Sequence, residues 1–124
     1  RVNFVADKCF ATRRGVRPGD FRASGSWIVD LDVSHIPKEA IKIAFEVSSK
    51  LKLQTAAFDF VLHNDKPLIV EVSYGFGFPE GLFKQGFWDS SLTYHPGEFN
   101  PFGWIVEDVI SSIKAKKDKT ITLQ

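Results

Sequence analysis

Residues 56–74, AAFDFVLHNDKPLIVEVSY, are the stretch of the chain that decides the fold. Two runs rich in strand-forming residues, 57–62 and 67–73, flank a turn-forming segment at 63–66. Asn and Asp tolerate the left-handed backbone of a tight turn, and Pro67 can stand only where a strand begins. The stretch therefore predicts an antiparallel β-hairpin.

Folding this hairpin about its turn pairs Val61 with Ile69 and Asp59 with Glu71. Because side chains alternate along a strand, Ser73 is expected on the same face as Glu71. Facing residues have Cβ atoms about 4.5–5.5 Å apart, where like charges repel. Two explanations stay open: a bound hard cation such as Mg²⁺, or a register shifted by one or two residues with one carboxylate paired to an arginine. The other face of the hairpin is expected to be apolar: Phe58, Phe60, Leu62, Leu68, Val70 and Val72.

The composition is that of one soluble globular domain at residues 1–124. A net charge of +1 argues against a broad nucleic-acid-binding surface, and no apolar run approaches the roughly 20 residues of a membrane span. Cys9 stands alone, which excludes a disulfide framework and fits a cytoplasmic location. The chain has no methionine and starts abruptly in a strand-like run, so we expect a fragment of a longer protein.

The rest of the chain predicts further strands and two helices. Residues 1–5 and 9–14 are expected to form a hairpin, and residues 27–33 a strand. Apolar residues at helical spacing predict a helix at 36–51, with Pro37 in its first turn.

Residues 75–100 lack periodicity and are rich in aromatic residues, which indicates a long loop that covers another part of the molecule. Asn100 and Pro101 are expected to begin the last helix, as cap and first residue. One apolar stripe runs along that helix: Phe102, Ile105, Val106, Val109, Ile110 and Ile113. The order of elements predicts an α+β fold, a mostly antiparallel sheet with two packed helices.

A cluster of arginines precedes the hairpin, beside the small residues of segment 24–26. The guanidinium fork matches phosphate and carboxylate oxygens, and small residues let backbone N–H groups approach an anion. Combined with the carboxylate pair, this cluster predicts a nucleotide-phosphate site with a metal between the two. Its members are Arg13, Arg14, Arg17 and Arg22.

Asp59, Glu71 and Ser73 together resemble the metal-binding end of the ATP-grasp fold, where an Asp is followed by an apolar strand that ends Glu-Val-Asn. Segments 1–8, 12–14 and 19–26 resemble the strand-turn, the Arg-rich strand and the Arg-containing loop of glutathione synthetase-like and ribosomal-modification-type ligases. Segment 79–101 is similar to ATP-grasp proteins encoded beside polysaccharide-biosynthesis genes. The resemblance implies that the chain is the C-terminal subdomain of an ATP-grasp fold.

The resemblance also implies roles for individual residues. Asp59 and Glu71 would hold Mg²⁺ against ATP, with Ser73 in place of the family's Asn. Arg22 would be the catalytic residue that stabilises charge on the transferring phosphoryl group. The residues implied to bind ATP are Arg1, Arg14 and Ser24, the last of which also replaces an Asn.

The expected function is that of the C-terminal portion of an ATP- and Mg²⁺-dependent carboxylate–amine ligase, acting through an acyl-phosphate in surface polysaccharide biosynthesis. Its expected partners are ATP, a small carboxylate and the N-terminal half of the same protein, without which the fragment should be inactive; neither nucleic acid nor a membrane span is expected. The alternative is a non-catalytic binding or assembly module with a degenerate ATP site.

Overall fold

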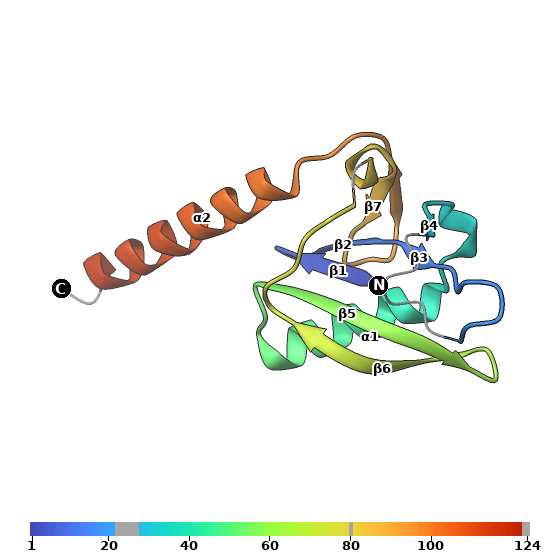
Figure 1. The fold of residues 1–124 in the computed structure, drawn as a ribbon. Helices are drawn as coiled ribbons and strands as arrows, with labels where there is room; N and C mark the ends of the chain where they lie inside the picture. Colours follow the sequence, from blue (N-terminus) through green and yellow to red (C-terminus); the bar gives the residue numbers. More distant parts are fainter. Residues whose placement is uncertain (22–27, 80, 123–124) are drawn as a thin grey trace.

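The structure is a computed structural model, and it describes residues 1–21, 28–79 and 81–122. In this part of the chain the fold is α+β, as predicted, with one six-stranded antiparallel sheet and two α-helices (Figure 1). The sheet order is β6-β5-β1-β2-β7-β8, and β3 pairs with β4 as a separate two-stranded ribbon. The strands are β1 (Val2–Val5), β2 (Lys8–Ala11), β3 (Arg13–Arg14), β4 (Val29–Asp30), β5 (Thr55–His63), β6 (Lys66–Ser73), β7 (Gly86–Trp88) and β8 (Tyr94–Pro96). The helices are α1 (Lys38–Leu51) and α2 (Pro101–Thr122), with short 3₁₀ turns at Val33–His35 and Leu82–Lys84.

One face of the sheet packs against α1. Val2 and Phe4 of β1 and Phe58 of β5 alternate onto this face and are buried. They meet the apolar side of α1, where Ile41 and Ala44 are also buried. The helix begins after Pro37, two residues later than predicted, and it ends where Lys52 adopts a left-handed conformation.

The opposite face carries a layer of aromatic side chains. Val5 and Phe10 project from the sheet and are covered by Leu82 and Phe99. The segment that supplies this cover was predicted to be one long loop, but it also contains β7 and β8, which extend the sheet. The expectation that it covers another part of the molecule is confirmed, because Phe10 is fully buried beneath it. The partly buried rings that complete the layer are Phe76, Phe78, Phe83, Phe87 and Trp104.

The β5–β6 hairpin has a different register at its tip from the one predicted. Asn64 and Asp65 both have positive φ angles and form a two-residue turn. Val61 therefore pairs with Leu68, and the predicted pairing with Ile69 is wrong. A β-bulge next to Asp59 then adds one residue to β6.

The same bulge places Asp59 opposite Glu71, and this predicted pairing is confirmed. The predicted apolar face is only partly correct, because Leu68 shares the face of its partner Val61 rather than that of Phe58. Towards the tip and along the edge, most apolar side chains of the hairpin are exposed: Val61, Leu62, Leu68, Ile69, Val70 and Val72.

The remaining elements follow the predictions in part. The hairpin of β1 and β2 is confirmed, with a turn at Ala6 and Asp7. The predicted strand at 27–33 is reduced to β4, and its Trp27 lies outside the described residues. The last helix begins at Pro101 as predicted, and the Asn100 side-chain oxygen accepts a hydrogen bond from the Gly103 N–H at 3.2 Å.

Candidate metal and phosphate site

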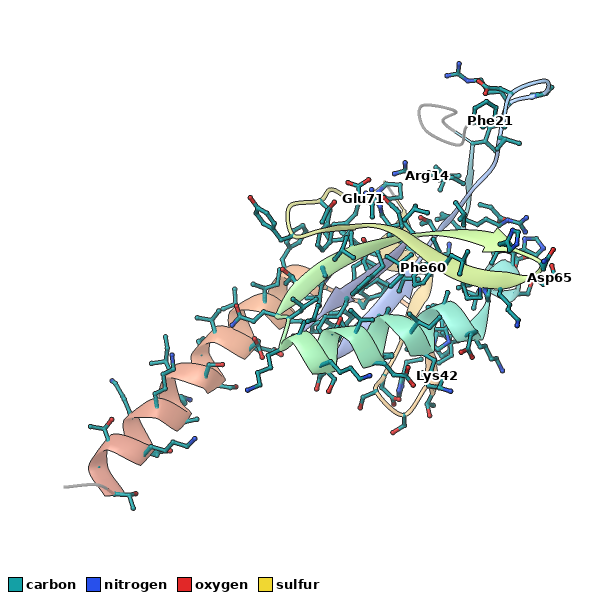
Figure 2. All side chains as sticks on the ribbon, turned by 90° about the horizontal axis from the view of Figure 1, so that it is seen from below. Arg14, Phe21, Lys42, Phe60, Asp65 and Glu71 are labelled. Atoms are coloured by element: carbon teal, nitrogen blue, oxygen red, sulfur yellow. The ribbon has the colours of Figure 1, made fainter. Side chains whose placement is uncertain are left out.

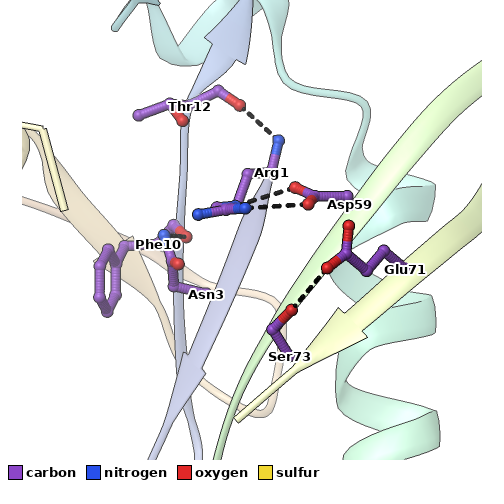
Figure 3. Close-up of polar contacts among 7 residues, drawn as sticks. All are labelled: Arg1, Asn3, Phe10, Thr12, Asp59, Glu71 and Ser73. Atoms are coloured by element: carbon purple, nitrogen blue, oxygen red, sulfur yellow. Dashed lines mark hydrogen bonds and ion pairs between the residues drawn. The ribbon is translucent and has the colours of Figure 1, made fainter. Parts of the chain in front are cut away.

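The sheet face opposite α1 carries a group of polar side chains beside the aromatic layer (Figure 3). Phe58 points to α1, so its neighbour Asp59 points to the other face. Cross-strand pairing puts Glu71 directly opposite Asp59, and Ser73 follows on the same face. The three residues predicted as metal ligands are therefore brought together.

Arg1 binds Asp59 through two parallel hydrogen bonds. Its Nε lies 2.8 Å from Oδ1 and its Nη2 lies 2.9 Å from Oδ2, and both side chains are partly buried, at 19% and 26% exposure. Arg1 is itself held by the residue that follows β2, because its backbone nitrogen donates to the Thr12 carbonyl and the Thr12 N–H donates back to the Arg1 carbonyl. This is the two-pronged geometry that makes arginine a strong partner for carboxylates.

The ion pair sets the charge of the site. The hydrogen bonds from Arg1 hold the pKa of Asp59 below its ordinary value, against an opposing effect of partial burial. The charge of Arg14 lowers the same pKa further. Asp59 in turn raises the pKa of Arg1, and Glu71 contributes to that increase. Both carboxylates thus lie close enough to one guanidinium to feel its charge.

Glu71 is more accessible than Asp59. It is exposed, and its Oε1 accepts a hydrogen bond from the Ser73 hydroxyl at 3.0 Å. Each carboxylate oxygen has two lone pairs, so Glu71 and Asp59 keep acceptor capacity after these contacts are made. The donor set of two carboxylates and a hydroxyl consists of hard oxygens, which is what Mg²⁺ prefers.

The structure thus combines the two explanations that the sequence left open. The carboxylates face each other, as a cation site requires, and one of them is also paired with an arginine. A divalent ion at Glu71 would therefore share Asp59 with Arg1 or displace it. Among residues 1–21, 28–79 and 81–122, no group of three or more His, Cys, Asp or Glu is placed to hold a metal. A carboxylate pair suffices for Mg²⁺ when substrate phosphates supply other ligands.

The predicted phosphate-binding residues are only partly described. Arg14 lies exposed in β3. Figure 2 shows Arg14 and Glu71 on one side of the sheet, and Lys42 of α1 on the other side. Arg22 and Ser24 fall in segment 22–27, outside the described residues. Within the described part, Arg1 and Arg14 supply positive charge to this face.

Asn3 belongs to this face and was not singled out from the sequence. It is buried at 1% exposure on β1, and its Nδ2 donates to the Phe10 carbonyl at 3.4 Å. Its Oδ1 has no hydrogen-bond partner within the described chain. A polar residue inside the apolar run of β1 was the signal that could have marked it, because buried amides normally satisfy both groups.

Other residues that could carry chemistry are occupied elsewhere. His35 pairs with Asp30 at 2.6 Å and His95 with Asp89 at 2.7 Å, both on the surface. Cys9 is buried, and burial raises the pKa of its thiol. A buried thiol of this kind is unreactive.

Comparisons with known proteins identify no relative. No family model, no curated protein and no solved structure matches the chain. None of the helices in the described residues is long and apolar enough to cross a membrane.

The Arg1–Asp59 pair predicts a specific loss of stability in acid. Because the folded-state pKa of Asp59 is depressed, its contribution is fully present above the ordinary pKa of about 3.9 and is lost as the pH falls through the folded-state value. In urea titrations from pH 6 to pH 2, the chain should lose about 1 kcal/mol more of its unfolding free energy than Asp59→Asn. Equal acid losses in the two proteins would show that the pair adds no stability.

Proposed function

We propose that this chain is the metal- and phosphate-binding part of an ATP-dependent, Mg²⁺-dependent carboxylate–amine ligase of the ATP-grasp kind. The observation that carries the proposal is the pairing of Asp59 with Glu71 on adjacent strands, with the Arg1 guanidinium beside both. Two facing carboxylates are unfavourable on their own, and a site that binds a divalent cation next to an anionic ligand gives them a role.

Each side chain has a defined task in this proposal. Asp59, Glu71 and Ser73 would hold the ion, which supplies charge neutralisation at the phosphates when bound. Arg1 and Arg14 would contact phosphate oxygens from the same face, and Arg22 would stabilise charge on the transferring group. Positioning and electrostatics supply most of the rate enhancement in phosphoryl transfer, so this set needs no covalent nucleophile.

The proposal extends beyond this chain. It requires an N-terminal half of the same protein that holds the nucleotide, so the 124 residues alone should not turn over ATP. A small carboxylate would be the substrate, with an acyl-phosphate as the activated form. Surface polysaccharide production in the cytoplasm is the proposed setting, on the resemblance of segment 79–101.

Neutralising either carboxylate should weaken Mg²⁺-ATP binding to the longer protein that joins this chain to the N-terminal half. Glu71→Gln and Asp59→Asn keep the side-chain shape and remove one ligand charge each, so each should cost at least tenfold in affinity, or about 1.4 kcal/mol. Isothermal titration of Mg²⁺-ATP measures the affinity, and ADP release should fall in parallel.

The matched control is Asp65→Asn, which removes a carboxylate from the tip of the same hairpin while keeping a residue that tolerates positive φ. It should leave affinity within about twofold. Glu71→Gln is the cleaner test, because Glu71 is exposed and acts on Arg1 only through its charge, whereas Asp59 is hydrogen-bonded to Arg1. Unchanged affinity in Glu71→Gln, with the fold intact by circular dichroism, would rule out the proposed metal site.

A second function is favoured by the Arg1–Asp59 ion pair itself. If the guanidinium permanently replaces a cation at Asp59, the chain is a non-catalytic binding or assembly module with a degenerate ATP site. Arg1→Ala separates the two functions. If the chain is a non-catalytic module, the Arg1→Ala variant should be less stable, and nucleotide binding should be undetectable as before. If the chain is part of a ligase, the same variant should have a measurable but weaker Mg²⁺-ATP affinity.

A further inference from the structure

The last helix, α2, extends away from the sheet and leaves its apolar stripe uncovered (Figures 1 and 2). Only its first turns pack on the aromatic layer, through Phe102, Trp104 and Ile105. Beyond them, the side chains of the predicted apolar stripe are about half exposed. The α2 stripe consists of Val106 (58%), Val109 (46%), Ile110 (47%) and Ile113 (52%).

The charges of α2 are divided between its two halves. Residues 101–112 contain Glu107 and Asp108 and no basic residue, whereas residues 113–122 contain four lysines and Asp118. Two such helices side by side in parallel would bring the lysine-rich halves together and repel each other. In an antiparallel arrangement, each basic half lies along the acidic half of the other helix, and the helix dipoles also oppose each other favourably.

We propose that α2 is the dimerisation surface of this chain, and that two copies pair through their α2 stripes in antiparallel orientation. A twofold axis near residues 110 and 111, at the middle of the helix, lets the two helices overlap along their full length. Ile113 then packs against the partner's Val109, and this contact occurs twice because the interface is symmetric. The proposal does not depend on the nucleotide site.

The same symmetry pairs opposite charges along the edge of the stripe. At about 3.6 residues per turn, Glu107 and Lys114 lie two turns apart on one flank of the helix, next to the apolar residues. Antiparallel pairing about residues 110 and 111 brings Glu107 beside the partner's Lys114, once on each side of the axis. This pair sets the orientation and register of the helices.

The side chains at the far end of α2 also leave a space between them. Ile113, Lys117 and Ile121 line a shallow hollow on the helix surface, together with Lys116 and Thr120. Under the same axis, the partner's Phe102 lies opposite the end of this hollow. Phe102 is 56% exposed even though its ring contacts Phe78 and Phe83, so half of its surface remains for a partner.

Sedimentation velocity of the 124-residue chain over a concentration series tests the proposal. We expect a reversible monomer–dimer equilibrium, because a single pair of helices forms a small interface. Ile113→Lys should weaken the dimer by at least tenfold, since it puts a charge at the centre of the apolar contact. Ala115→Lys is the matched control: it adds the same charge to the opposite side of the same helix and should change the dissociation constant by less than about twofold.

Charge reversal tests the antiparallel orientation. Glu107→Lys and Lys114→Glu should each weaken the dimer by about fivefold or more, because two like-charged pairs form per dimer. The double variant with both changes should return to within about twofold of the unmodified chain. A monomer at every concentration, a dimer that Ile113→Lys leaves intact, or a double variant weaker than both single ones would each overturn the proposal.

Discussion

Replacing Phe10 with alanine is expected to lower the free energy of unfolding by about 3–5 kcal/mol. Phe10 has no exposed surface, and its ring centroid lies 5.2 Å from Phe78, 5.0 Å from Phe99 and 6.2 Å from Trp104. Removing the ring leaves a cavity between the sheet and the segment that covers it, and the surrounding rings cannot collapse fully into that space. Urea unfolding followed by tryptophan fluorescence measures the loss.

The control for this variant is Phe21→Ala, which removes the same ring from a side chain that is 90% exposed. It should change the unfolding free energy by no more than about 0.5 kcal/mol. A loss below about 1 kcal/mol in Phe10→Ala would show that the aromatic layer does not form a second core. The result also bears on the site, because Phe10 and the polar group at Arg1 and Asp59 share one face of the sheet.

The second large effect is expected for Gly86→Ala, with a loss of about 3 kcal/mol or more. Gly86 is buried in β7 with φ +127°, a backbone conformation that side chains other than glycine rarely adopt. A Cβ at this position would meet the His95 carbonyl oxygen and the Tyr94 hydroxyl of the neighbouring strand. Backbone strain and overpacking each cost about 1–3 kcal/mol, so together they should disrupt the β7–β8 pairing.

Gly77→Ala is the matched control for the second prediction. Gly77 is exposed with nothing within 4 Å of an added Cβ, and its φ lies outside the left-handed range. The change should be neutral or slightly stabilising, because alanine restricts the unfolded chain more than glycine does. Thermal denaturation of the two variants gives the comparison. If Gly86→Ala unfolds at the same temperature as Gly77→Ala, the strand pairing adapts without cost.

Local pattern predicted most of the secondary structure correctly. The hairpins and the two helices depend on alternation, helical spacing and turn residues, which act over a few positions. The register at the tip of the β5–β6 hairpin was wrong because a two-residue turn and a bulge give the same pairing at Asp59 as one longer turn. The strands β7 and β8 were missed because three-residue strands carry almost no periodic signal.

The candidate site was predictable only in part. Alternation and pairing were enough to bring Asp59, Glu71 and Ser73 to one face. The partner of Asp59 could not be inferred from spacing, since Arg1 lies 58 positions away and reaches it only because β1 pairs with β5. The same holds for Asn3, whose burial results from the strands on both sides of β1.

The sequence by itself determined the two main hairpins, the two helices, the α+β class and the facing carboxylates, because these follow from the order of side chains along neighbouring stretches of chain. Only the tertiary structure decided that β1 and β2 lie at the centre of the sheet, that Arg1 forms an ion pair with Asp59, and that the α2 stripe is left uncovered. These features depend on contacts between residues far apart in the chain, and an apolar stripe in a sequence does not specify whether the chain itself or another molecule buries it.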